Sequence, residues 1–239
     1  MPSTRLTWDN IGERLYETGI DHVVLYVKDS TTPPVEGMNG HYAGVAWNGV
    51  TGITESPSGA EPTAIYADNI KYLNLLSNEE LSLTLEALTY PDEFRVCDGT
   101  AQVSTGKGFY ISQQKRKEFA LCYRTLIGND TEGNDKGYQI HIVYNCLAAP
   151  SERAHSTVND TPETMTMSWS ISTTPEEFTV GTGANAVTYH ASAHVVLDST
   201  EVDATKMASV LEELYGNDAG TKTPHLLTPD NIATIVNAT

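Results

Sequence analysis

The loop between Gly128 and Gly137, GNDTEGNDKG, has the spacing closest to a metal site. Asp130, Glu132 and Asn134 occupy alternate positions, as the first oxygen ligands of a calcium-binding loop do. The rest of that motif is missing, because its glycine is misplaced and His141 stands where a bidentate carboxylate is required. We therefore expect a solvated hairpin loop without calcium.

Two histidines, His190 and His194, are four residues apart, a spacing that lets two side chains share an ion on a helix. They lie instead in the alternating segment AVTYHASAHVVL, Ala186 to Leu197, which predicts a strand. On one strand they would stand roughly 13 Å apart, at about 3.3 Å per residue. The prediction is that the chain has no metal site and no cofactor.

Patterns typical of catalysis are missing from the sequence. The segment STGKG around Lys107 lacks the spacing of a phosphate-binding loop, and no GxSxG nucleophile motif occurs. Cys97, Cys122 and Cys146 are odd in number and form no CxxC pair, so neither a disulfide framework nor a zinc site is expected. We expect the cysteines to be buried as small apolar residues and the protein not to be an enzyme.

One basic cluster, Lys115, Arg116 and Lys117, stands out in a chain with 14 basic and 31 acidic residues. A solvated strand end is one interpretation. A patch that pairs with the acidic surface of a neighbouring copy is the other, and the sequence leaves both open. The formal charge of −17 repels phosphate, so stable nucleic-acid binding is disfavoured.

The elements that must position these residues are predicted to be mainly strands. Short runs of β-branched and aromatic residues are bounded by Gly, Pro, Asn or Asp. The predicted strands are DHVVLYVKD (Asp21–Asp29), HYAGVAWNGVTGIT (His41–Thr54), AIYADNIKYL, EELSLTLEAL, GKGFYIS, KEFALCYRTLI, GYQIHIVYNCLA, TMTMSWSIST (Thr164–Thr173) and AVTYHASAHVVL. The segment ESPSGAEPT, Glu55 to Thr63, is rich in Pro, Gly and Ser and is expected to be an exposed loop.

The clearest helical signals lie in the C-terminal part of the chain. Asp203 can cap a helix with a 0, 3, 4, 7 apolar stripe, and Gly216 can end it, which predicts a helix over about 203–215. A second, short capped turn is expected from Thr228 to about Val236, with Pro229 at its first position.

The stretch from Tyr66 to Leu88 is ambiguous, because its leucines fit both a helical and a strand period. From Glu80 to Glu86, leucines alternate strictly with polar residues, which is the period of a half-buried strand. The neighbouring β runs favour the strand. Its leucines would then face the interior, and its other face would present Glu80, Ser82, Thr84 and Glu86.

The composition is that of a soluble globular protein, with 239 residues, 39% hydrophobic, and no apolar run near the ~18 residues of a membrane helix. The length suits a single all-β domain. The first twenty residues carry charges and no apolar core, so no secretory signal is expected, and the chain would be made and kept in a cytosol.

Several segments together resemble the major tail proteins of long-tailed bacteriophages of the siphophage type, closest to the branch from Gram-positive hosts. The likeness covers most of the chain, in the same order throughout. Its segments are WDNIGERLYETGIDHVVLYV, WNGVTGITESPSGAEPTAIYADNIKYLNL, EFALCYRTLIGNDTEGNDKGYQIHIVYN, PSERAHSTVNDTPE and DSTEVDATKMASVLEELYG.

The resemblance implies one tail tube domain over 1–239. It would comprise an N-terminal arm (1–20), a β-sandwich or partial barrel with one flanking helix (21–215), and a C-terminal arm (216–239). Six copies would form a ring, each giving four strands to a 24-stranded inner barrel, and the rings would stack into a tube. Strands about 4.8 Å apart and tilted about 40° would make that barrel roughly 50 Å across, with a lumen of roughly 40 Å.

The resemblance also implies a non-enzymatic role, in which the tube conducts double-stranded DNA from capsid to host without binding it stably. Six copies of −17 give −102 per ring, and an acidic lumen would keep phosphates off the wall. Glu80, Ser82, Thr84 and Glu86 are the candidates for this wall. The candidates for a loop reaching the adjacent ring are Glu55, Pro57, Gly59, Glu61 and Pro62.

The implied partners are further copies of the chain, a tape-measure protein, a tail terminator and a baseplate or distal tail protein, with no membrane. The implied location is the virion tail, reached from the host cytoplasm during assembly.

Two other classes of protein are consistent with the predicted strands and the aromatic residues. One is a secreted β-sandwich binding or adhesion module, and the other is a β-sandwich hydrolase. The missing signal sequence weighs against the first, and the missing nucleophile or metal set against the second.

Overall fold

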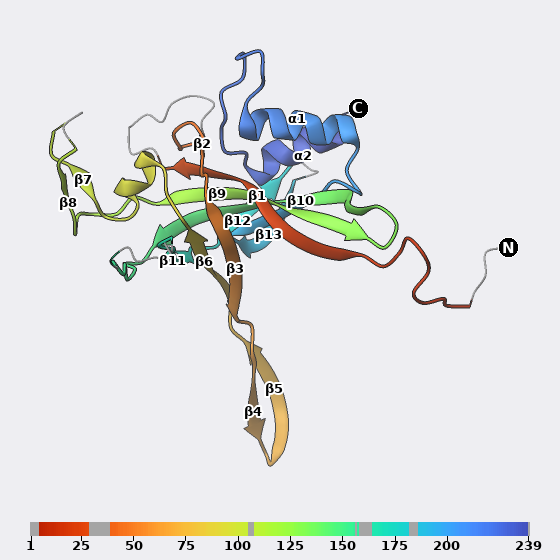
Figure 1. Cartoon of the computed structure of the whole chain (residues 1–239). Coiled ribbons are helices and arrows are strands. Elements are labelled where there is room, and N and C mark those ends of the chain that lie inside the picture. The colour runs from red at the N-terminus through yellow and green to blue at the C-terminus, as the bar shows by residue number, and fades with distance from the viewer. Residues whose placement is uncertain are drawn as a thin grey trace.

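The computed structural model describes residues 5–28, 39–104, 108–155, 157, 164–181 and 186–238. The fold is mainly β, as predicted, with two α-helices among the described residues and no sheet closed into a barrel (Figure 1). The elements are β1 (Tyr16–Val27), β2 (Val45–Ala46), β3 (Val50–Gly59), β4 (Pro62–Ala67), β5 (Ile70–Leu76), β6 (Glu79–Ala87), the 3₁₀-helix η1 (Asp92–Val96), β7 (Ala101–Gln102), β8 (Tyr110–Ile111), β9 (Phe119–Asn129), β10 (Gly133–Ala148), β11 (Met167–Thr173), β12 (Glu176–Val180), β13 (Val187–Ser192), β14 (His194–Asp198), α1 (Ala204–Tyr215) and α2 (Pro229–Asn237).

The main sheet is antiparallel and eight-stranded, in the order β2-β1-β9-β10-β11-β6-β3, with β14 also paired to β10. The long strand β10 pairs with β14 over Gln139–Val143 and with β11 over Cys146–Ala148. Between these stretches the register shifts, and Asn145 has a positive φ of 50°. This bulge bends β10, so that its first part pairs with β14 and its last part pairs with β11.

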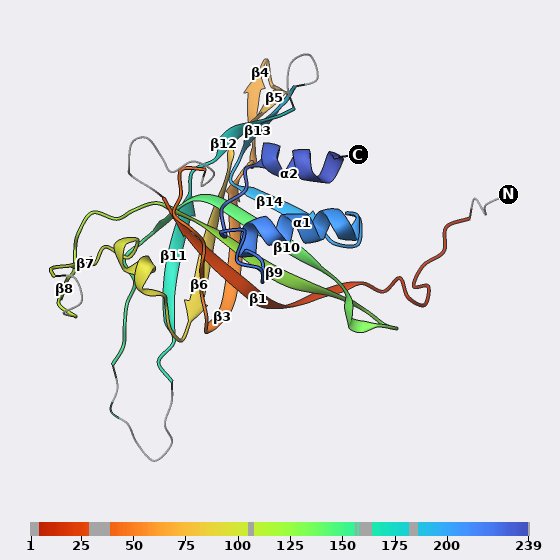
Figure 2. The same cartoon turned by 90° about the horizontal axis from the view of Figure 1, so that it is seen from above.

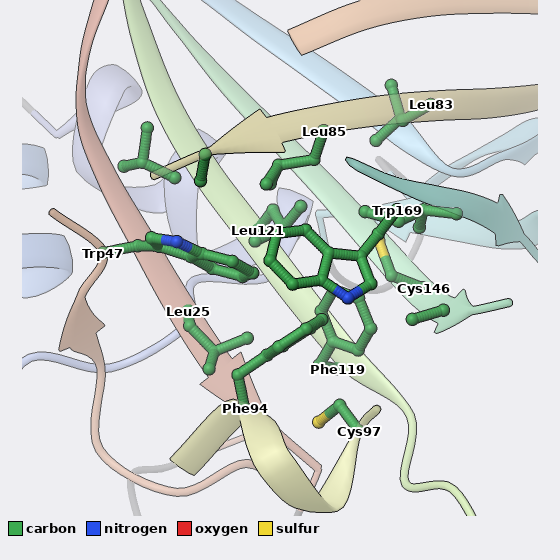
Figure 3. Close-up of a cluster of buried hydrophobic side chains, with 14 of the residues drawn as sticks. Leu25, Trp47, Leu83, Leu85, Phe94, Cys97, Phe119, Leu121, Cys146 and Trp169 are labelled. Atoms are coloured by element: carbon green, nitrogen blue, oxygen red, sulfur yellow. The ribbon is translucent and has the colours of Figure 1, made fainter. Parts of the chain in front are cut away.

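One face of the sheet packs around an aromatic core (Figure 3). Trp169 of β11 contacts Trp47 and Phe94 edge-on, with ring centroids 5.6 Å and 5.3 Å away. Leu83 and Leu85 of β6 are fully buried in this core. The strand interpretation of 80–86 is therefore confirmed, with the leucines inside.

The other face carries α1 and α2, which lie side by side over the part of the sheet that contains β10 and β14 (Figure 2). Met207, Val210 and Leu214 of α1 are buried there, as the apolar stripe predicts. The second helix, capped by Thr228 with Pro229 at its start, is also confirmed. The segment that the resemblance assigns to a C-terminal arm packs in this chain onto its own body, with Leu226 and Leu227 buried.

The cap of α1 gives a direct stability prediction. The Asp203 carboxylate accepts hydrogen bonds from the backbone N–H groups of Thr205 and Lys206. We expect Asp203→Ala to lower the free energy of unfolding by about 1 kcal/mol and the melting temperature by about 2–4 °C, measured by circular dichroism. Asp218→Ala, which removes an exposed carboxylate beyond the helix, is the control and should change neither. Equal stability of the two variants would contradict the capping role.

The predicted strand AIYADNIKYL is two strands, β4 and β5, joined by a turn, and His41–Thr54 is divided into β2 and β3. Two further predicted segments are wrong. Glu55–Thr63 is not a loop, because β3 runs through Gly59 and β4 starts at Pro62. Pro57 is tolerated because β3 is an edge strand, where a missing N–H breaks no ladder. The second wrong segment, Ala186–Leu197, is two strands in different sheets, β13 and β14, divided at the buried Ala193.

The three cysteines are free and buried, as predicted. Burial raises the pKa of the Cys97 and Cys122 thiols to about 12, and it raises the pKa of Cys146 as well. The segment STGKG lies partly outside the described residues.

Candidate functional site

A polar surface covers three neighbouring strands on the side of the sheet away from the aromatic core. Thr84 of β6 lies between Thr54 of β3 and Ser170 of β11, and Ser82 lies between Ser56 and Ser172 in the same way. Glu86 is opposite Ser168, and Glu80 is opposite Ser58. We call this set the hydroxyl face: Thr54, Ser56, Ser58, Glu80, Ser82, Thr84, Glu86, Ser168, Ser170 and Ser172.

The structure thus brings the four predicted wall residues onto one face of one strand. Glu80 and Glu86 are exposed, while Ser82 and Thr84 are half-buried between their hydroxyl neighbours. Strands β3, β6 and β11 contain no Lys or Arg. The hydroxyl face therefore offers water-binding groups and negative charge, but no cation that could hold a phosphate.

The hairpin β4–β5 projects from the end of the hydroxyl face, away from the helices (Figure 1). Its strands pair with each other and, among the described residues, with no other strand. Every residue of β5 is exposed, including Ile70 at 64% and Tyr72 at 69%. An isolated two-stranded hairpin of this kind is marginally stable in water, and its apolar side chains are largely exposed in the single chain.

The local sequence explains why this hairpin forms and where it points. Asp68 and Asn69 at its tip have φ of 50° and 64°, as a tight two-residue turn requires. At its base, Gly59 has φ of 87°, and a Cβ there would collide with the Asn78 carbonyl oxygen. Of the residues predicted to reach an adjacent ring, Glu55, Pro57 and Gly59 lie in β3, Glu61 precedes the hairpin and Pro62 begins it.

The described N-terminal segment, residues 5–15, extends away from the sheet (Figure 2). It exposes large apolar side chains, including Trp8 at 75% and Ile11 at 80%. Its inner end is fastened to the turn between β9 and β10, where the Gly12 N–H donates to Asp130 Oδ1 at 2.9 Å. The predicted hairpin loop at 128–137 is therefore present, and its Asp130 carboxylate anchors the arm.

The basic cluster precedes β9. Lys115 is exposed, whereas Arg116 donates from Nη1 to the carbonyl oxygen of Ala148 at 2.6 Å. The Lys117 ammonium lies 5.1 Å from the centre of the Tyr42 ring. Two of the three cations thus have contacts within their own chain, and the patch facing another copy stays a prediction.

A second polar cluster, which the sequence did not indicate, joins Glu55, His141 and His194. The Nδ1 atom of His141 lies 3.1 Å from Nε2 of His194 and 3.6 Å from Oε1 of Glu55. Burial lowers the pKa of His141 to about 4, so its imidazole is neutral at pH 7. Burial lowers the pKa of His194 too.

This histidine cluster was missed because its members come from three strands, β3, β10 and β14. The spacing in the sequence suggested pairing His194 with His190. In the structure His190 lies on β13 with its side chain exposed, and it is not part of the cluster. Only the pairing of β10 with β14, which places Val143 opposite His194, brings His194 next to His141.

Among the described residues, no helix has both the length and the apolar character needed to cross a membrane.

Comparisons with known proteins give distant structural matches. No family model matches the chain, and no curated protein matches it. One similar solved structure is a chain of the anti-feeding prophage baseplate, with 8% identity, a TM-score of 0.34, and coverage of 80% of this chain and 97% of that one. Another is a chain of an extracellular contractile injection system, the PVC sheath-tube complex in its extended state, with 11% identity, a TM-score of 0.30, and coverage of 74% and 88%.

Proposed function

We propose that this protein is the structural, non-enzymatic subunit of a phage tail tube, in which hexameric rings stack and their lumen conducts double-stranded DNA. The observation that carries the proposal is the hydroxyl face, a continuous polar surface without cations on three adjacent strands. Such a surface suits a wall past which a polyanion must slide, because each Lys or Arg there would add a phosphate contact and slow movement. The sequence resemblance points to the same role.

The sheet has two edges that suit assembly into a ring. The edge strand β3 lies at one end of the sheet order, and the short strand β2 lies beside β1 at the other. Pairing β3 of one copy with the β1–β2 edge of the next would be a head-to-tail contact, which closes into a ring when the rotation permits. The hydroxyl faces of successive copies would then form one continuous inner wall.

The exposed hairpin and the N-terminal segment supply the remaining contacts in this proposal. Both display exposed apolar side chains, so burial against neighbouring copies would stabilise an assembly. Other proposed partners are a tape-measure protein inside the tube, and a terminator and a baseplate or distal tail protein at its ends. The proposed location is the virion tail.

Assembly of the purified protein tests the proposal. We expect rings or tubes of uniform bore in negative-stain microscopy, and more of them as added salt screens the charge of −17 per chain. A species that stays monomeric at high protein concentration and high salt would contradict the tube and favour the alternative, a β-sandwich binding module.

A further inference from the structure

The histidine cluster lies where the sheet folds over on itself. Strand β3 is at one end of the sheet order and β10 is in its middle, yet Glu55 of β3 reaches across to β9 and β10. The Tyr123 hydroxyl donates to Glu55 Oε1 at 2.5 Å, and the Tyr123 ring stacks on His141 with centroids 4.7 Å apart. Two imidazoles and one carboxylate thus converge at the boundary of the aromatic core.

The spacing of the three side chains matches a metal-ligand set. One ligand atom from each of Glu55, His141 and His194 lies within 4.8 Å of the others. In a tetrahedral zinc site with bonds of about 2.1 Å, ligand atoms are about 3.4 Å apart. From His141 Nδ1 the separations are 3.1 Å to His194 Nε2 and 3.6 Å to Glu55 Oε1, on either side of that value. The other ring nitrogen of His194, Nδ1, is 3.9 Å from Glu55 Oε2.

Neighbouring groups orient the ligands as outer-shell partners do in metal sites. His141 Nε2 is 3.1 Å from Thr125 Oγ1, so it can donate its proton there and leave the Nδ1 lone pair directed at the cluster. The Tyr123 hydroxyl holds the Glu55 carboxylate in place.

The cluster is also accessible. A cavity of about 240 Å³ is lined by Glu55 and His194, together with Glu79, Ser192 and Pro175. It gives an ion a path from solvent and leaves room for a water molecule as fourth ligand. The Glu79 carboxylate adds negative charge to that path.

We propose that Glu55, His141 and His194 bind one divalent transition-metal ion of the zinc type, with the fourth position open to the cavity. The ion would tie β3 to β10 and β14, and so fix the strand from which the hairpin β4–β5 projects. This site belongs to the single chain and does not depend on tube formation.

Zinc titration of the chelator-treated protein tests the site. We expect one Zn²⁺ per chain by isothermal titration calorimetry, a higher melting temperature with zinc, and tetrahedral absorption bands when Co²⁺ replaces it. His194→Gln and Glu55→Gln should each weaken Zn²⁺ binding at least about 10-fold, because loss of even an outer-shell partner typically costs about 10-fold to 100-fold in metal affinity. Both side chains are partly exposed, so folding of these variants can be verified by circular dichroism.

His190→Gln is the matched control, since it removes an exposed histidine from the adjacent strand and should leave zinc affinity unchanged. The site is refuted if the wild-type protein takes up no stoichiometric Zn²⁺. It is equally refuted if the folded His194→Gln variant binds Zn²⁺ as tightly as His190→Gln does.

Discussion

Replacing Ile70 and Tyr72 with threonine is expected to abolish tube formation while leaving the single chain as stable as before. Both side chains are more than half exposed, so the monomer loses little burial, and threonine keeps the preference for strand. In the assembly each side chain would contribute about 1.5–3 kcal/mol on burial. Losing both should raise the concentration needed for assembly at least about 100-fold. Sedimentation and negative-stain microscopy would measure this change.

The control for the hairpin variant lies on the same strand. Asn74→Thr replaces an exposed polar residue with threonine two positions beyond Tyr72 and should assemble normally. The melting temperatures of both variants should match that of the unmodified protein. Normal assembly of the Ile70→Thr, Tyr72→Thr protein would show that the hairpin does not carry the contact between copies.

Reversing the charge of Glu80 and Glu86 is expected to slow DNA release about ten-fold or more in particles that carry the variant subunit. Both side chains are exposed on the hydroxyl face, so lysines there would add phosphate contacts in every ring. Tube length should not change, because the wall residues do not set the number of rings. The rate of dye-detected DNA release after triggering would measure the effect. Added salt should reduce it by screening the new contacts.

A control variant with the same net charge distinguishes the effect of the residues at positions 80 and 86 from the effect of the total charge of the particle. Asp218→Lys with Glu93→Lys makes the same charge change off the hydroxyl face, at one exposed position beyond α1 and one on η1. This variant should release DNA at the normal rate. Equal rates for both double variants would place Glu80 and Glu86 outside the lumen.

The elements with strong local signals could be predicted from the sequence. Strict alternation identified β6 and its inward leucines. Successive side chains of a strand point to opposite faces, so only one orientation of this segment buries all its leucines. Asp203 and Gly216 marked the ends of α1, because capping depends on residues next to the helix. The same alternation placed Glu80, Ser82, Thr84 and Glu86 on one face of the strand and needed no long-range information.

Features set by distant strands could not be predicted. Pro57 reads locally as a loop residue, and only the edge position of β3 makes it compatible with a strand. The break at Ala193 depends on β10, whose Tyr144 N–H donates to the Ala193 carbonyl oxygen at 2.8 Å. Glu55, His141 and His194 meet because of the register of the folded sheet, which no spacing in the sequence records.

The buried thiols bear on how long a finished particle keeps its activity. In the proposed role the protein passes from a reducing cytosol to an oxidising exterior, where exposed cysteines would form mixed disulfides and link neighbouring tubes. Burial raises the pKa of the Cys97 and Cys122 thiols to about 12, so they stay protonated and unreactive at pH 7. Because all three cysteines are buried, we expect oxygen not to oxidise them in the folded protein. The activity of stored particles should then not depend on added reductant.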